Sequence, residues 1–187
     1  MIEKKIRIIK TLLENGKVNI REIANLSKID YKDAYYLIKN LASEGILTLR
    51  KHGNSYIVSL KKRFHPLIIM GEYERREEIL KNKTAKVIFN RLKELDFQFI
   101  AILFGSFIKR KNYNDIDFLI ICEKNREKKI EEALSILPLN LHLNFFDYEE
   151  FISMLKSREF NVINEALKNY IVLIGVEDFC RLLENAK

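Results

Sequence analysis

The chain has 187 residues, a length that suits one large domain or two small ones. It contains no apolar run near the roughly 20 residues of a membrane span, and its start lacks a signal-peptide pattern, so we expect a cytoplasmic protein with no membrane partner. The net charge of +7 is uneven, because residues 1–65 hold 14 Lys and Arg against six Asp and Glu. That excess is typical of a nucleic-acid-binding module joined to a near-neutral one. The alternative is a basic module without such a ligand.

The first 60 residues predict three helices followed by a β-hairpin. Apolar residues recur at helical spacing from Ile2, and Gly16 is a stop signal. Asn19 and Asp30 are suited to cap the second and third helices. A Gly-Asn pair between two β-rich runs indicates a tight turn. We therefore expect helices over 2–14, 20–27 and 31–43, and strands over 46–50 and 56–60.

This order of elements resembles a winged helix-turn-helix domain, and its apolar pattern is similar to that of many archaeal and bacterial repressors. In such domains the second helix of the motif enters the major groove of duplex DNA and the hairpin touches the backbone or minor groove. The resemblance implies DNA as a partner. The side chains suited to contact phosphates, sugars and bases are Tyr31, Lys32, Tyr35, Lys39, Arg50, Lys51, His52 and Asn54. Protein contacts are the alternative use of this surface.

A basic triplet at 61–63 followed by His65-Pro66 indicates a domain boundary. We expect a DNA-binding domain over 1–62, a helical linker over 63–83 and a second domain over 84–187. Thr84 is expected to cap a helix there, and Asp147 another. The pattern predicts a linker helix over 67–81. In the second domain it predicts helices over 85–95, 127–137, 160–168 and 177–184, and strands over 97–104, 118–122, 139–146 and 171–174. The expected fold is a two-domain α+β or α/β protein with a mixed sheet flanked by helices.

Residues 103–122 are the most informative segment. An apolar strand ends in Gly105-Ser106, and eight residues later Asp115-Ile-Asp117 enters a second apolar strand. On a strand this i, i+2 spacing puts both carboxylates on one face, and two convergent carboxylates suit Mg²⁺ together with substrate phosphates. A Gly-Ser turn lets backbone N–H groups approach a phosphate. The alternative is a surface turn with two solvated acids.

This ordered combination resembles the signature of the DNA polymerase beta-like nucleotidyltransferase superfamily, over roughly residues 84–151. It is most similar to the minimal nucleotidyltransferases, which are often the antitoxin of a toxin–antitoxin pair. The resemblance implies that Asp115 and Asp117 bind Mg²⁺ or Mn²⁺ and that NMP passes from an NTP to an acceptor. The acceptor would be a protein, a nucleic acid or a small molecule. The residues expected to hold the nucleotide are Gly105, Ser106, Lys109 and Arg110, although the last two also suit a solvated loop.

One feature departs from that family, whose members usually carry a third carboxylate on the neighbouring strand. Here the polar face of 139–146 offers Asn140, His142 and Asn144 instead. We expect His142 to act as a base or as a ligand of a softer metal, and Asn144 is suited to supply an oxygen. The alternative for His142 is a polar residue of a half-exposed strand. Two functions therefore stand: a metal-dependent nucleotidyltransferase, and a non-catalytic transcriptional regulator whose degenerate domain senses nucleotide or binds a partner. A partner toxin and a second copy of this chain, in a homodimer, are further candidate partners.

The two cysteines, Cys122 and Cys180, occur singly in apolar sequence. They form no metal-type cluster, and we expect them to be buried thiols rather than a disulfide.

Overall fold

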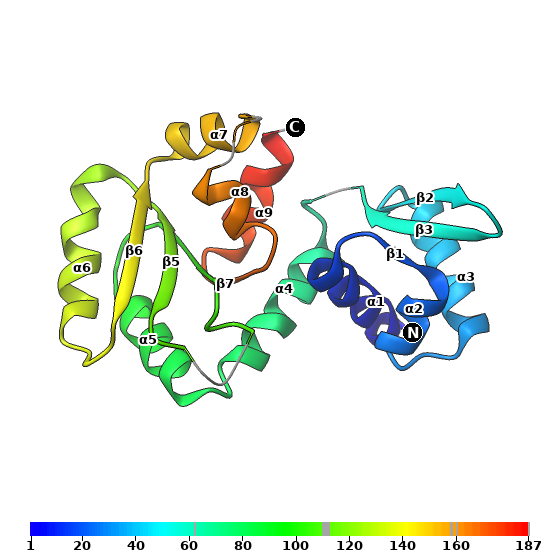
Figure 1. Cartoon of the computed structure of the whole chain (residues 1–187), viewed down its shortest axis with the longest axis horizontal. Coiled ribbons are helices and arrows are strands. Elements are labelled where there is room, and N and C mark those ends of the chain that lie inside the picture. The colour runs from blue at the N-terminus through cyan, green and yellow to red at the C-terminus, as the bar shows by residue number, and fades with distance from the viewer. Residues whose placement is uncertain (62, 110–112, 158, 160, 187) are drawn as a thin grey trace. The chain divides into compact units, whose positions relative to one another are not determined.

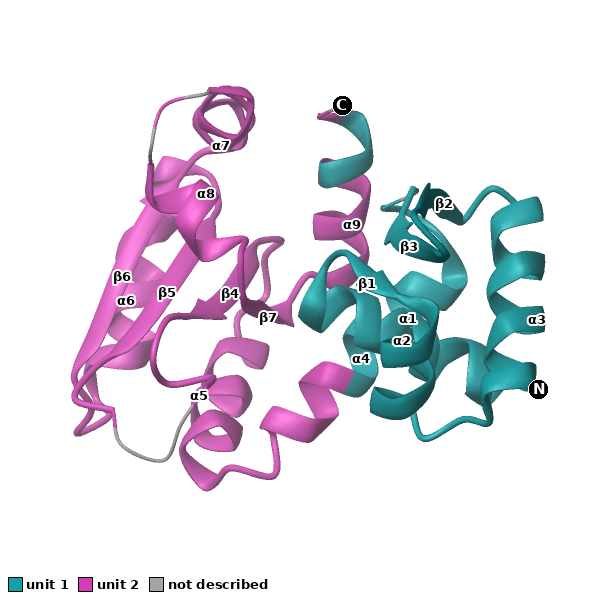
Figure 2. Cartoon of the chain, turned by 45° about the vertical axis from the view of Figure 1, so that its right-hand side comes forward, with its two compact units in different colours: residues 1–74, 183–185 teal, residues 75–182, 186–187 magenta. Residues whose placement is uncertain are grey.

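The computed structural model describes residues 1–61, 63–109, 113–157, 159 and 161–186. In these residues it is a mixed α+β protein with nine α-helices and two sheets (Figure 1). The chain divides into two compact units, residues 1–74 with 183–185 and residues 75–182 with 186–187 (Figure 2). Helices α4 (Pro66–Ile79) and α9 (Val176–Asn185) are each shared between the units. Among the described helices, none has the length and apolar character needed to cross a membrane.

The first unit contains the three helices and the hairpin that the sequence predicts, with ends that differ by at most two residues. Its elements are α1 (Ile2–Asn15), β1 (Val18–Asn19), α2 (Ile20–Leu26), α3 (Tyr31–Ser43), β2 (Leu47–His52) and β3 (Ser55–Leu60). The antiparallel sheet has the order β1-β3-β2. Strand β1 was not expected; its Val18 pairs with Val58 and adds a third strand to the hairpin.

Local side-chain contacts explain where these elements begin. The side chain of Asn19 accepts the backbone N–H of Glu22, and that of Asp30 accepts the N–H of Lys32, so both predicted caps are confirmed. The hairpin loop has two residues, because His52 and Ser55 are the last strand pair. Gly53 supplies the positive φ of 56° that this tight turn requires.

The second unit is built on a four-stranded sheet of order β6-β5-β4-β7. Strands β5 and β6 are parallel and the other neighbours are antiparallel, so the predicted mixed sheet is confirmed. Its elements are α5 (Lys83–Lys93), β4 (Ile100–Phe104), β5 (Ile116–Ile121), a 3₁₀ turn (Lys124–Arg126), α6 (Glu127–Ser135), β6 (Leu141–Phe146), α7 (Tyr148–Lys156), α8 (Val162–Ala166) and β7 (Tyr170–Ile174), followed by α9.

Helices α5 and α6 cover one face of this sheet. Ile88 of α5 and Ile130 of α6 share a fully buried cluster with Phe118 of β5, and Leu141, Leu143 and Phe145 of β6 pack against it. Because side chains alternate across a strand, the residues between them, including Asp117 and His142, lie on the opposite face. The alternation predicted for β6 is thus confirmed, and it separates the apolar core from the polar face.

Two further predictions about the second unit have definite outcomes. Asp147 caps α7 in a capping box with Glu150, as expected. The cap predicted at Thr84 is wrong: α5 begins earlier, and the side chain of Asn82 accepts the N–H groups of Thr84 and Ala85. Cys122 and Cys180 are buried thiols, and burial raises the pKa of Cys122 to about 11.

Candidate functional site

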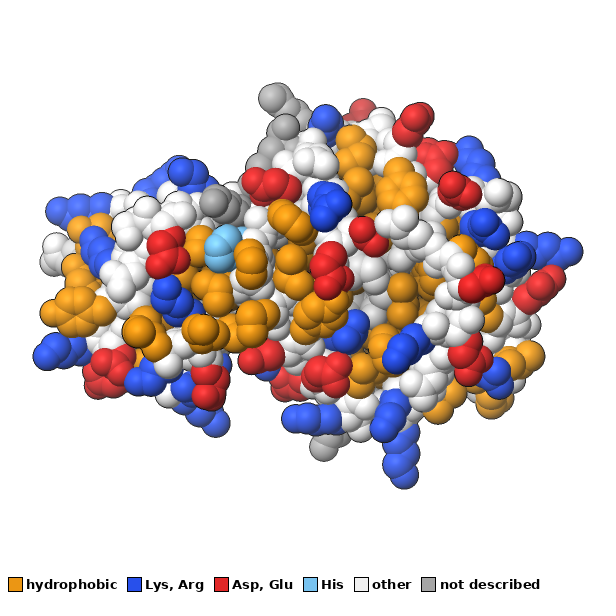
Figure 3. Space-filling model, turned by 180° about the vertical axis from the view of Figure 1, so that it is seen from behind, with side chains coloured by type: hydrophobic (Ala, Val, Ile, Leu, Met, Phe, Trp, Pro, Cys, Tyr) orange, Lys and Arg blue, Asp and Glu red, His pale blue; other side chains and the backbone are white. Residues whose placement is uncertain are grey.

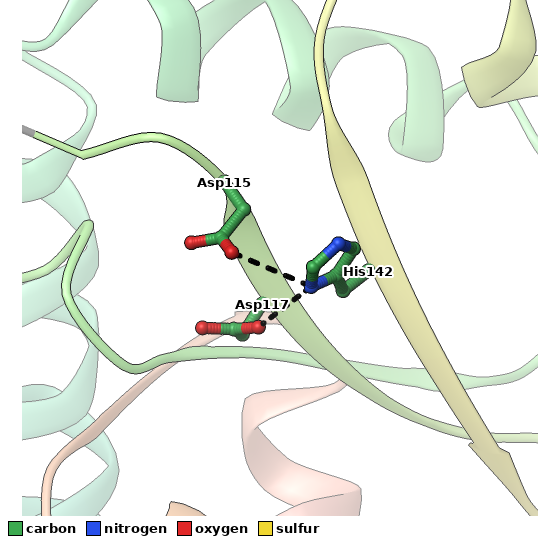
Figure 4. Close-up of side chains that lie close together, drawn as sticks. All are labelled: Asp115, Asp117 and His142. Carbon is green, nitrogen blue, oxygen red and sulfur yellow. Dashed lines mark ion pairs between the residues drawn. The ribbon is translucent and has the colours of Figure 1, made fainter.

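Asp115, Asp117 and His142 converge on one face of the sheet in the second unit (Figure 4). The Nδ1 atom of His142 lies 3.6 Å from Oδ2 of Asp115 and 3.5 Å from Oδ1 of Asp117. One ligand atom from each residue fits within 4.8 Å of the others. When the imidazole is protonated, it forms an ion pair with both carboxylates.

The pairing of two strands brings these residues together. Asp117 lies within β5, beside its parallel partner His142 of β6, and Asp115 is the residue just before β5. The start of the pair is fixed by a hydrogen bond from the Ile116 N–H to the Asn140 carbonyl, at 3.0 Å. The sequence predicted a strand beginning at Phe118, whereas β5 begins two residues earlier. The second carboxylate is therefore held by the sheet itself rather than by the preceding loop.

Gly105 lies against Asp117 at the end of β4. Its φ is +77°, and a Cβ placed on it would overlap the Asp117 carboxylate. Phe104, the last residue of β4, pairs with Asp117 across the antiparallel ladder, which explains the proximity. A glycine here therefore satisfies two conditions, a left-handed backbone and clearance for a carboxylate. The second condition was not visible in the sequence.

Aromatic residues pack together from the two ends of the segment that connects β4 to β5. Phe107 is buried in the core cluster, and its ring meets that of Tyr113 edge-to-face with centroids 4.6 Å apart. The Lys109 N–H donates to the Ser106 carbonyl at 3.1 Å and closes a turn after Gly105. Ser106 and Lys109 are exposed in this turn. Arg110, expected to help hold a nucleotide, lies outside the described residues.

The three polar residues of the neighbouring strand have different roles. Asn140 donates to the Asn114 carbonyl at 3.4 Å, and Asn144 donates to the Phe118 carbonyl at 3.0 Å, so both amide groups are bonded to backbone of the β5 segment. His142 alone faces the two aspartates. Among the described residues, no carboxylate joins the Asp115–Asp117–His142 group. Asp147, another acid near this strand, is bonded to Glu150 and lies 3.4 Å from Lys124.

These donors are accessible to a ligand from solvent. The exposed fractions of the side chains are 35% for Asp115, 26% for Asp117 and 53% for His142. Two carboxylate oxygens and one imidazole nitrogen at these separations fit a single divalent cation, whose open positions would be available to substrate oxygens. The donor set therefore suits a divalent metal ion.

A groove of about 520 Å³ lies further along β6, where Phe145 and Phe146 meet α7. Glu149 and Glu150 line it together with Ser153 and Met154. Two carboxylates disfavour a triphosphate in this groove, because like charges repel. The groove does not include the aspartates.

The predicted DNA-contacting residues occupy α3 and the hairpin of the first unit. Most are exposed, namely Tyr31, Lys32, Arg50, Lys51, His52 and Asn54. Tyr35 and Lys39 are half-buried, and the Lys39 ammonium lies 4.4 Å from the ring centroid of Tyr56 and 5.6 Å from that of Tyr35. Tyr56, which the sequence did not single out, therefore holds Lys39 where the helix meets the hairpin.

On the face of the molecule in Figure 3, Lys and Arg side chains are interspersed with Asp and Glu rather than gathered into one patch. The α3 helix also carries an acid that is partnered by a base: Lys4 of α1 pairs with Asp33 of α3 at 2.5 Å, and this hydrogen bond lowers the Asp33 pKa.

Comparisons of the chain with protein-family models, curated proteins and solved structures found no match.

Proposed function

We propose that this chain is a DNA-binding winged-helix protein whose second unit is a nucleotidyltransferase domain of the DNA polymerase beta-like type. It would transfer an NMP group from an NTP to a protein or nucleic-acid acceptor with the help of a divalent cation, Mg²⁺ or Mn²⁺. The observation that carries the proposal is the convergence of Asp115, Asp117 and His142 beside the Gly105 turn. The two aspartates and the glycine of the sequence motif lie together, which supports a single phosphate-handling site.

In this reaction an acceptor hydroxyl oxygen attacks the α-phosphorus of the NTP. The bond from that phosphorus to the bridging oxygen breaks, pyrophosphate leaves, and the hydroxyl proton passes to a base. A bound cation supplies charge neutralisation on the phosphate oxygens. It is needed because Asp115 and Asp117 would otherwise repel the triphosphate. His142 lies within 3.6 Å of both carboxylates, so it would hold the cation together with them or accept the proton.

The segment after β4 supplies the phosphate-binding part of the proposal. Gly105 has no side chain to block the approach of a phosphate to its backbone, and Ser106 adds a hydroxyl at the exposed turn. Lys109 offers an ammonium from the same turn. Positive charge here would complement the β- and γ-phosphates and help pyrophosphate to leave.

Label transfer tests the proposal directly. The full chain is incubated with α-³²P-labelled NTPs, Mn²⁺ or Mg²⁺, and a lysate of the source cells. We expect label on a specific protein or nucleic acid that depends on the added chain. NTPs labelled only at the γ-phosphate should give no label that depends on it, because that group leaves with pyrophosphate. A partner toxin would be identified as a labelled protein. Absence of label with all four NTPs and both cations would contradict the proposed transferase activity.

A second function is favoured by the histidine at the position of the third carboxylate. With one charge fewer, the site is less suited to hold a second cation for turnover than to bind a nucleotide once. In that case the protein is a transcriptional regulator, and the second unit senses nucleotide or binds a partner. NTP-dependent change in DNA affinity without label transfer would identify this function.

The DNA-binding part of the proposal predicts a defined salt dependence. Full-length protein should bind duplex DNA with an affinity that falls as salt rises, because neutralised phosphates release counterions. Lys32→Ala should lower the slope of log affinity against log salt by about one, since Lys32 is exposed on α3. Lys39→Ala should do the same. Fluorescence anisotropy across a salt series measures both slopes.

Lys128→Ala is the matched control, because Lys128 is an exposed helical lysine of the second unit, 85% accessible. Its slope should equal that of the wild type. If Lys32→Ala and Lys39→Ala also had the wild-type slope, α3 would not be part of the DNA interface.

A further inference from the structure

The donor set at the candidate site differs in kind from three carboxylates. His142 contributes a neutral nitrogen where an acid would contribute a charged oxygen, so the set carries a charge of −2 rather than −3. Mg²⁺ prefers oxygen ligands in near-ideal octahedral geometry and keeps several waters. Imidazole nitrogen suits later first-row metals, whose affinity rises from Mn²⁺ through Co²⁺ toward Cu²⁺. The site therefore loses attraction for Mg²⁺ and gains it for a metal that accepts nitrogen.

The positions of the donor atoms suit such a metal. Metal–ligand bonds of about 2.0–2.2 Å in a tetrahedral or octahedral shell separate neighbouring ligand atoms by about 3.0–3.5 Å. Nδ1 of His142 already lies 3.5 and 3.6 Å from the two carboxylate oxygens. All three ligand atoms lie within 4.8 Å of one another, so side-chain rotations would bring them to one ion.

The surrounding contacts leave this nitrogen as the third donor. Asn144, two residues along the same face of β6, donates its amide to the Phe118 carbonyl. Asp147 is occupied by the capping box of α7 and by Lys124. Gly105 keeps the space beside the Asp117 carboxylate clear. Backbone hydrogen bonds of the parallel β5–β6 pair fix His142 against Asp117.

We propose that Asp115, Asp117 and His142 form a site that selects an imidazole-accepting transition-metal dication, of the Zn²⁺, Co²⁺ or Mn²⁺ class, over Mg²⁺. This inference deepens the proposed function. Only the role of the ion in the reaction rests on that function. His142 acts as a metal ligand in it. The metal preference follows from the donor atoms and holds in the absence of nucleotide.

Metal binding by the full-length protein, without nucleotide, tests the inference. After treatment with a chelator, the protein is titrated calorimetrically with Mg²⁺, Mn²⁺, Co²⁺ and Zn²⁺. Affinity should rise in that order, with Co²⁺ bound at least about 100-fold more tightly than Mg²⁺. His142→Gln should weaken Co²⁺ and Zn²⁺ by at least about tenfold and Mg²⁺ by less than about twofold. Visible absorption of bound Co²⁺ should change in the same variant.

Two further variants make the result decisive. His52→Gln, a histidine of the exposed hairpin loop, should bind every cation like the wild type. His142→Asp should raise the affinity for Mg²⁺ and narrow the preference for Co²⁺ over Mg²⁺, because it adds a charged oxygen that suits Mg²⁺. This gain also excludes misfolding as the cause of a weakened His142→Gln. Co²⁺ affinity that is unchanged in His142→Gln, or Mg²⁺ affinity that falls as much as Co²⁺ affinity, would overturn the inference.

The outcome is separable from that of the proposed function. Co²⁺ binding through His142 without label transfer would retain the metal site and reject the enzyme. Label transfer with Mg²⁺, in a protein whose His142→Gln variant binds Co²⁺ normally, would retain the enzyme and reject this selectivity.

Discussion

Asp117→Asn is expected to remove cation-dependent NTP binding, with a loss of affinity of at least about 100-fold. Asparagine preserves the size of the side chain but removes one of the two negative charges that attract the cation. The wild-type Asp117 oxygen lies 3.5 Å from His142, so it is a central member of the group. Calorimetry with a non-hydrolysable NTP analogue, with and without Mn²⁺, measures the effect. The variant with Mn²⁺ should resemble the wild type without it.

Asp96→Asn provides the matched control, because Asp96 is an exposed acid of the same unit outside the group. It should bind nucleotide as the wild type does. Equal affinities in wild type, Asp117→Asn and Asp96→Asn would show that nucleotide, if it binds, does so elsewhere.

Gly105→Ala should also disable the site, although it leaves every donor atom in place. The new methyl group would overlap the Asp117 carboxylate, so the carboxylate must leave its present position. We expect the affinity for Co²⁺ and for cation–NTP to fall by at least about tenfold, because ligand positions must hold to within about 0.5 Å. The free energy of unfolding should also fall by about 1 kcal/mol or more, since φ is positive here. Metal titration and urea denaturation measure the two effects.

Gly45→Ala separates the two causes. Gly45 has a φ of +72°, close to that of Gly105, but no atom lies within 4 Å of a Cβ built on it. Its alanine variant should lose similar backbone stability and retain full metal affinity. If Gly105→Ala binds metal as well as Gly45→Ala does, the close approach to Asp117 has no role in the site.

The sequence predicts the elements of the site well because the signals are local. The i, i+2 spacing of Asp115 and Asp117, the glycine at a strand end and the alternation of β6 each depend on a few consecutive residues. Such patterns place side chains on a face of one strand. They do not say which residue of a neighbouring strand lies opposite.

That missing information is the register of β5 and β6. Asn140, His142 and Asn144 share one face. The chemistry of its side chain favoured His142 as a site residue, but no local pattern placed it rather than Asn140 or Asn144 opposite Asp117. The parallel pairing of Asp117 with His142 decides it, and this register depends on contacts between residues 25 positions apart. The same limit explains why the contact of Lys39 with Tyr56, and the overlap of a Gly105 side chain with Asp117, were not predicted.

The place of β6 in the sheet gives the site a mechanical property. In the order β6-β5-β4-β7, this strand stands at one end, and among the described strands it pairs only with β5. Two of the three donors belong to the β5 segment and the third to β6, so an ion held by all three would fasten the outer strand to its neighbour. Occupancy of the site and local opening of β6 are then thermodynamically linked: whatever frees the strand releases the ion, and the ion slows the exchange of the strand's amide hydrogens.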